Sequence, residues 1–88
     1  MNNIVLNSIS VLKKQFGDIE ILGCYDNNKS LMFSIKPKNM EVYDAFFLVD
    51  KVTGKVSEYA YLNDLENFKD MQNNPKRKIN INKEDIND

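Results

Sequence analysis

The chain has 88 residues and a formal net charge of −1 at pH 7, with 12 Lys and Arg against 13 Asp and Glu. This length provides for one compact domain, and the balanced charge gives no overall attraction to nucleic acid or to anionic membranes. Hydrophobic residues make up 42% of the chain, an ordinary share for a globular protein, which argues against wholesale disorder.

The residues that most often carry enzyme chemistry are scarce. Cys24 is the single cysteine and histidine is absent, which excludes an intramolecular disulfide and a multi-cysteine metal site and removes the usual general base. No apolar run approaches the roughly 20 residues of a membrane-spanning helix, and no charged leader precedes the first apolar residues. We therefore expect a cytoplasmic, non-enzymatic protein with no cofactor, no metal site and no catalytic residue.

The first predicted element is a helix over residues 3–16. Its apolar residues recur at helical spacing and are Val5, Ile9, Leu12 and Phe16. This pattern places them on one face, and the lysines near the C-terminal end suit the helix dipole. Gly17 follows at the position where helices often end in a left-handed residue, so it predicts the helix terminus.

Four strands are predicted next, over residues 19–25, 31–36, 42–50 and 56–61. Apolar and polar residues alternate in the second strand, and Pro37 ends it because proline cannot donate to a ladder. The third strand is apolar on both sides, which predicts a central position in the sheet. Because the connections are short, we expect the four strands to form an antiparallel meander.

The third and fourth predicted strands are joined by a loop that contains Thr53, Gly54 and Lys55. Turn preferences place Gly54 in a left-handed bulge position. A phosphate-binding P-loop needs the GxxxxGK[ST] pattern, which is absent, so we interpret the loop as structural. Residues 46–56 resemble the hairpins that recur in PepSY-type domains and in some bacterial immunity proteins, and this resemblance of turn chemistry implies no functional residue.

A second, short helix is predicted over residues 64–72. Asn63 with Glu66 three residues later resembles a capping box, and Pro75 follows the helix as a stop signal. The sequence thus predicts an α+β fold in the order α-β-β-β-β-α. In it, the N-terminal helix packs on a four-stranded antiparallel meander, and the short C-terminal helix shares the same face of the sheet or closes one end.

The C-terminal residues are polar, with isolated isoleucines. We place the single domain at residues 1–74 and a polar, partly disordered tail at residues 75–88. Because isoleucines stand at both ends of residues 79–81, a short edge strand is an alternative to disorder for this segment.

The aromatic residues are the most informative candidates for a binding site. Tyr59 and Tyr61 share one side of the predicted fourth strand, and Phe46 lies on either side, depending on the register. The first helix covers only one face of the sheet. The second helix or the tail covers the other face, or that face is exposed and binds a partner. Because Tyr, Phe and Met are enriched in interface cores, Phe46, Tyr59 and Tyr61 are the candidate partner-binding residues.

Lys76, Arg77 and Lys78 form a basic cluster that provides an alternative site, one for nucleic-acid phosphates. Acidic residues follow in the tail and offset this charge, which disfavours nucleic acid as the partner. The carboxylates near the third and fourth strands match no catalytic or metal-binding motif, so we interpret them as solvated charges and helix caps.

The first functional hypothesis is a small protein-binding domain that acts through an exposed aromatic sheet face or through an edge strand. Its small size, lack of histidine and asparagine-rich composition suit a phage or mobile-element accessory protein, such as an inhibitor or an immunity-type protein. Pairing of edge strands also makes a homodimer a candidate assembly. The alternative is a nucleic-acid-binding accessory protein that uses the basic cluster from Lys76 to Lys78.

Overall fold

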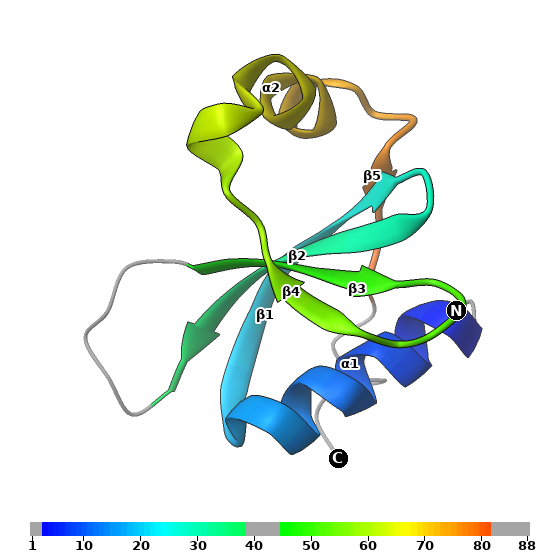
Figure 1. The fold of residues 1–88 in the computed structure, drawn as a ribbon, viewed down its shortest axis with the longest axis vertical. Coiled ribbons are helices and arrows are strands. Elements are labelled where there is room, and N and C mark those ends of the chain that lie inside the picture. Colours follow the sequence, from blue (N-terminus) through cyan, green and yellow to red (C-terminus); the bar gives the residue numbers. More distant parts are fainter. Residues whose placement is uncertain (1–2, 39–44, 82–88) are drawn as a thin grey trace.

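In the computed structural model, which describes residues 3–38 and 45–81, helices lie on both sides of a five-stranded antiparallel sheet (Figure 1). The elements in chain order are α1 (Asn3–Phe16), β1 (Ile19–Asn27), β2 (Ser30–Pro37), β3 (Ala45–Asp50), β4 (Val56–Glu58), the 3-10 helix η1 (Tyr61–Asn63), α2 (Leu65–Asn73) and β5 (Lys78–Ile79). The strands lie in the order β4-β3-β2-β1-β5. The predicted α+β class and antiparallel meander are confirmed, with one short strand added after α2.

α1 covers one face of the sheet with an aliphatic core. Val5, Ile9 and Leu12 are buried on one side of this helix, as their helical spacing predicts. The sheet side chains of this α1-face cluster are Ile19, Cys24, Leu31, Phe33, Ile35 and Val49. Gly17 has a φ of +78°, and its N–H donates to the Lys13 carbonyl at 2.9 Å, which confirms the predicted end of the helix.

α2 covers the opposite face of the sheet, which is aromatic. Met71 of α2, Met32 of β2 and Tyr59 are buried together. The half-buried side chains around them are Tyr25, Phe46, Leu48, Tyr61 and Phe68. The sequence left the position of the second helix open, and the structure places it across the sheet from α1. β2 lies between the two clusters and is buried on both sides.

β4 ends three residues earlier than predicted. Tyr59 continues the ladder by one hydrogen bond, from its N–H to the Phe46 carbonyl at 2.9 Å. The chain then bends at Ala60, where φ is −80° and ψ is 71°, and the Tyr61 N–H donates to the Tyr59 carbonyl. These are the features of an inverse γ-turn, which is common at strand ends. The prediction that Tyr59 and Tyr61 share one side of a strand is therefore wrong.

The cap of α2 also differs from the prediction. Asp64, rather than Asn63, is the N-cap residue, and its side chain makes no capping hydrogen bond. Its carboxylate instead accepts hydrogen bonds from the Tyr59 hydroxyl at 2.8 Å and from the Asn67 side chain at 2.9 Å. The capping-box prediction is wrong because Asp64 is used to attach the helix to the sheet.

Two turns fix the register of the sheet. In the β1–β2 hairpin, Asn28 has a φ of 60°, a left-handed conformation that Asn tolerates better than most residues. In the β3–β4 hairpin, the Asp50 carboxylate accepts hydrogen bonds from the N–H groups of Val52 and Thr53, each at 2.8 Å. Gly54 has a φ of 74°, which confirms its predicted left-handed position.

The sheet extends past the predicted end of the domain. β5 overlaps the predicted strand segment 79–81 only at Ile79, because it begins at Lys78 and ends at Ile79. It pairs antiparallel with β1, with Ile79 opposite Cys24. Ile79 and Ile81 pack against the α1-face cluster, so residues 75–81 continue the same folded unit. The start of the predicted third strand, residues 42–44, and the end of the tail, residues 82–88, lie outside the described residues. None of the described helices is long and apolar enough to cross a membrane.

Candidate functional site

The three aromatic residues selected from the sequence come together in the structure, under α2. Tyr59 is only 7% exposed, while Phe46 and Tyr61 are half-buried. The ring of Phe68, on α2, lies 5.1 Å from that of Phe46 and 4.9 Å from that of Tyr61. The sequence left open whether this aromatic face is covered or exposed, and in the structure it is largely an internal contact with Phe68 of α2.

An apolar corner remains beside this aromatic group. Leu62 in η1 is 69% exposed and Leu65 at the start of α2 is 43% exposed. They follow Tyr61 closely in the sequence, and neither belongs to the buried cluster under α2. We call Phe46, Tyr61, Leu62, Leu65 and Phe68 the aromatic corner.

The polar groups next to the aromatic corner satisfy one another. Besides its bond to Asp64, the Asn67 side chain donates to the Asn27 side-chain oxygen at 3.0 Å. Burial and the nearby Asp64 raise the pKa of Tyr59 to about 12, and the bonds from Asn67 and Tyr59 hold the pKa of Asp64 below its usual value. Both groups therefore keep fixed charge states at neutral pH, as structural rather than catalytic groups do.

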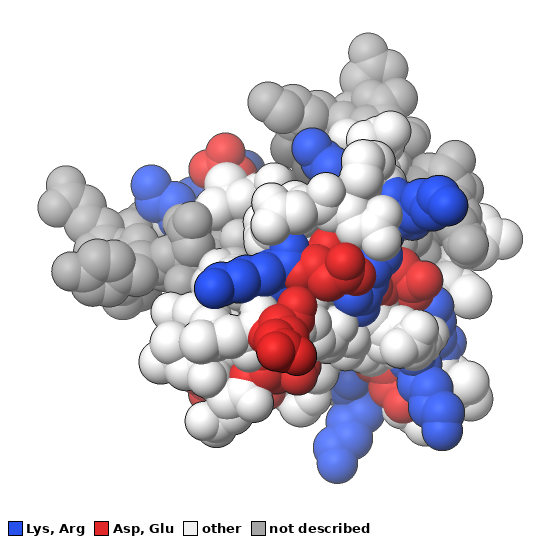
Figure 2. All heavy atoms as spheres, turned by 90° about the horizontal axis from the view of Figure 1, so that it is seen from above, with Lys and Arg blue, Asp and Glu red and all other residues white. Residues whose placement is uncertain are grey.

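The basic cluster is divided by the fold. Arg77 Nη1 lies 2.9 Å from the Asp70 carboxylate, and Arg77 Nε donates to the Asp26 carbonyl at 3.1 Å. Arg77 is thereby used to hold the chain before β5 against the β1–β2 hairpin, which leaves Lys76 and Lys78 exposed. On the face shown in Figure 2, Lys and Arg side chains are interspersed with Asp and Glu. This mixture differs from the basic stripe typical of nucleic-acid binding.

Cys24 is fully buried in the α1-face cluster. Burial, with a contribution from Asp26, raises the pKa of the thiol to about 12, so the nucleophilic thiolate is suppressed. Within residues 3–38 and 45–81, no group of three or more acidic, Cys or His side chains is arranged to hold a metal ion.

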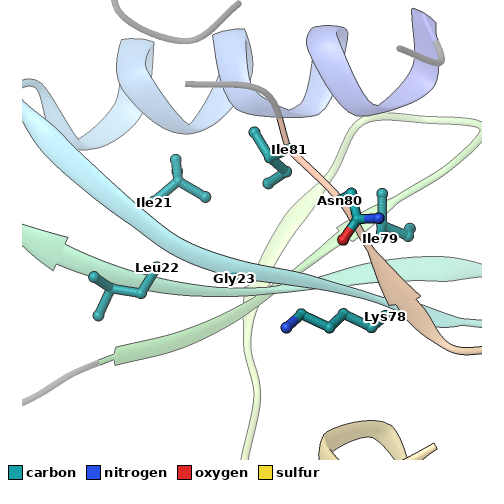
Figure 3. A pocket seen from close by; sticks show the side chains of 7 residues that line it. All are labelled: Ile21, Leu22, Gly23, Lys78, Ile79, Asn80 and Ile81. Carbon is teal, nitrogen blue, oxygen red and sulfur yellow. The ribbon is translucent and has the colours of Figure 1, made fainter. Parts of the chain in front are cut away.

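The outer edge of β1 is paired along only part of its length. β1 has nine residues, and β5 pairs with Cys24 and Tyr25 alone. After Ile79 the chain leaves the plane of the sheet toward α1 (Figure 3). Among the described residues, no strand pairs with β1 from Glu20 to Gly23 on the side away from β2. We call this segment the open edge.

In the open edge, the backbone N–H and C=O of Ile21 point away from the sheet. The Lys38 N–H donates to the Asp18 carbonyl at 3.2 Å, and alternate residues of an antiparallel strand turn their backbone groups to the same neighbour. Glu20 therefore bonds toward β2, and Ile21 turns its N–H and C=O outward. A register shift between Ile21 and Gly23 marks a β-bulge, a feature that is over-represented at sheet edges and next to active sites.

A pocket of about 220 Å³ lies where β5 separates from β1 (Figure 3). Ile21, Ile79 and Ile81 line it on the side of α1, and all three pack against the α1-face cluster. Lys78 also lines it. Lys78 is opposite Tyr25 in the ladder, and because Tyr25 packs in the α2-face cluster, Lys78 lies on the side of α2.

The absence of a side chain at Gly23 makes room for the Tyr25 ring. A Cβ added at Gly23 would lie 3.1 Å from the Tyr25 ring, which occupies the space that a side chain would take. The Tyr25 hydroxyl donates to the Gln72 side chain at 3.2 Å, so Tyr25 also connects the open edge to α2. The sequence analysis did not select this site, although an isolated glycine in a strand pattern is a signal for a bulge.

The open edge and its pocket combine unpaired backbone groups, apolar walls and a lysine. These are the elements of peptide recognition, in which main-chain hydrogen bonds and side-chain pockets act together. Comparison with protein-family models, with curated proteins and with solved structures finds no match to this chain.

Proposed function

We propose that this chain is a small protein-binding domain that takes an extended segment of another protein as an additional strand beside β1. The observation that carries the proposal is the open edge, where Ile21 turns its backbone N–H and C=O outward beside an apolar pocket. Edge strands with unpaired groups are templates for pairing with another chain. Catalysis has less support, because the side chains of Tyr59, Asp64 and Asn67 bond to one another and the Cys24 thiol is buried.

The two edges of the sheet differ in how far they favour such pairing. β4 has three residues and carries the exposed Ser57 and Glu58. Very short strands and charged side chains are the means by which proteins protect edges. The open edge instead presents Ile21 and Leu22, of which Leu22 is 44% exposed. We therefore assign the binding role to β1.

The size of the open edge sets the expected affinity. It spans four residues, from Glu20 to Gly23, and so provides few backbone hydrogen bonds, each with a net contribution of about 1 kcal/mol. One side chain in the pocket adds about 1.5–3 kcal/mol when it is fully buried. After the cost of ordering the peptide, an isolated segment is expected to bind in the range of about 10 μM to 1 mM.

Solution NMR suits an interaction of this strength. The ¹⁵N-labelled chain is titrated with acetylated, amidated seven-residue peptides in which Val and Thr alternate, a pattern that favours extended backbone. We expect saturable shifts at the amides of Ile21 to Gly23 and at residues 78–81, with slower hydrogen exchange of the Ile21 amide. Shifts confined to the aromatic corner would overturn the assignment to β1.

A matched pair of substitutions separates the two surfaces. Leu22→Lys adds a charge to the open edge, and Leu62→Lys adds the same charge to the aromatic corner. Both residues are exposed leucines, so neither change is expected to lower stability appreciably. We expect about tenfold weaker peptide binding for Leu22→Lys and unchanged binding for Leu62→Lys. The opposite result would place the site at the aromatic corner.

The homodimer expected from edge pairing is tested with the same variants. Light scattering of the chain at several concentrations measures its oligomeric state. A dimer that Leu22→Lys dissociates, and Leu62→Lys does not, would identify a second copy of this chain as the occupant of the open edge, in place of a different protein.

A further inference from the structure

We infer that the segment recognised by the open edge carries an aliphatic residue next to an acidic one, with the aliphatic side chain in the pocket and the carboxylate beside Lys78. This inference rests on the proposed function and specifies its partner. Strand geometry provides the starting point, because neighbouring residues of an added strand point to opposite faces of the sheet. The two faces of the open edge are chemically different.

On the side of α1, the pocket wall is aliphatic. Ile21 of β1, Ile79 of β5 and Ile81 of the segment that follows β5 converge there (Figure 3). The volume of about 220 Å³ is enough for one side chain of the size of Val, Leu or Ile. A residue of the added strand that points to this side is therefore selected for an aliphatic side chain.

On the side of α2, the pocket presents a cation. Lys78 is exposed, and within the described part of the chain its ammonium group takes part in none of the three ion pairs, which involve Lys38, Lys51 and Arg77. In Figure 3 its side chain runs below β1, on the side away from α1. A residue of the added strand that points to this side meets the Lys78 ammonium group.

The acidic residue of the same edge does not cancel this charge. Glu20 is opposite Lys36 in the β1–β2 ladder, so a cation of the protein already neighbours it. Lys78 has no such neighbour in its ladder, because its partner is Tyr25. Charge complementarity thus favours a carboxylate, and strand alternation places it directly before or after the aliphatic residue.

The test compares three seven-residue peptides that differ at one position. Each has Val at the centre, followed by Asp, Asn or Lys, with Thr and Val alternating elsewhere and both ends blocked. We expect the Asp peptide to bind about two- to fivefold more tightly than the Asn peptide at low salt, the effect of a partly exposed ion pair. The Lys peptide is expected to bind most weakly, and 0.5 M NaCl is expected to remove the differences.

Two substitutions assign the effect to Lys78. Lys78→Gln is expected to abolish the difference between the Asp and Asn peptides, and Lys78→Glu to reverse the order of the Asp and Lys peptides. Lys76→Gln is the matched control, because Lys76 is also exposed and does not line this pocket. If Lys76→Gln reduced the preference for the Asp peptide over the Asn peptide as much as Lys78→Gln does, the preference would come from general electrostatic attraction. That result would overturn the inference.

The outcomes separate this inference from the proposed function. Equal affinity of the Asp and Asn peptides, with shifts still centred on Ile21, would overturn the acidic preference and leave strand addition standing. The absence of shifts with all three peptides would overturn both. Binding of the Asn peptide with a free C-terminal carboxylate at the affinity of the blocked Asp peptide would assign Lys78 to a chain end and overturn the internal acidic residue.

Discussion

The two faces of the sheet are covered by helices of different length and by different interactions. α1 has 14 residues and packs mainly through aliphatic side chains such as Leu12. The aromatic rings on this face are Phe33 of β2 and the pair of Phe16 and Phe47, whose ring centroids lie 4.6 Å apart. α2 has nine residues and packs through Met71 and Phe68 on an aromatic surface. Hydrogen bonds between side chains, from Tyr59 to Asp64 and from Tyr25 to Gln72, join α2 to the rest of the fold.

Helix length explains why the two faces differ. At 1.5 Å per residue, α1 extends about 21 Å along the sheet and α2 about 14 Å. The shorter helix buries less apolar surface, so its position depends more on directional contacts, such as edge-to-face rings and hydrogen bonds to Asp64. The comparison implies that packing on the α1 face supplies most of the free energy of folding, while the directional contacts on the α2 face set the orientation of α2 on the sheet.

Truncation of Leu12 is expected to have the largest effect. Leu12 is fully buried against the α1-face cluster, so Leu12→Ala removes apolar contact and leaves a cavity between helix and sheet. We expect a loss of about 2–5 kcal/mol in the free energy of unfolding, measured by urea denaturation. A loss below about 1 kcal/mol would show that the α1 face is not the main source of stability.

Truncation of Met71 provides the matching test on the other face. Met71 is also fully buried and also lies on a helix, but apart from Met32 and Tyr59 the side chains of its cluster are only partly buried. We expect Met71→Ala to cost about 2 kcal/mol, the low end of the range for such changes. Because α2 is short, its amides are expected to exchange faster with solvent while those of α1 stay protected. A larger loss than for Leu12→Ala would reverse the comparison.

Removal of one hydroxyl tests the directional contacts of the α2 face. Tyr59→Phe deletes the donor to Asp64 and keeps the buried ring, so we expect a loss of about 1 kcal/mol. Tyr61→Phe is the control, because in the described structure its hydroxyl makes no hydrogen bond, and it is expected to leave stability unchanged. Equal effects of the two changes in urea denaturation would mean that the bond to Asp64 adds no stability.

The elements with regular patterns were predictable from the sequence. The helical spacing of Val5, Ile9 and Leu12 and the glycine after Phe16 predicted α1 with the same bounds as in the structure. β2, Ser30–Pro37, is longer than the predicted strand over residues 31–36 by only one residue at each end. These segments are governed by local periodicity and by terminal signals, which are visible in a short window of sequence.

The errors fall where distant residues decide the local structure. The end of β4 depends on the bend at Ala60 and on the burial of Tyr59 under α2, neither of which local propensity shows. The N-cap at Asn63 was predicted from a capping-box motif. In the structure Asp64 is the N-cap residue, and its carboxylate accepts a hydrogen bond from Tyr59 instead of capping the helix. The open edge was missed for the same reason, because only the position of β5 shows which part of β1 is left unpaired.

Acid titration gives the smallest expected effect and tests Asp64 itself. The hydrogen bonds from Asn67 and Tyr59 hold its pKa in the folded state below the usual value, so protonation favours the unfolded chain. This contribution to stability is complete above about pH 4 and is lost as the pH falls through the folded-state pKa. Asp50, whose pKa is lowered by the N–H groups of Thr53 and Val52, adds to the same loss.

We expect urea midpoints to fall between pH 4 and pH 2, and to fall less steeply for Asp64→Asn. Parallel curves for the two proteins would show that Asp64 makes no ionisation-dependent contribution to the attachment of α2.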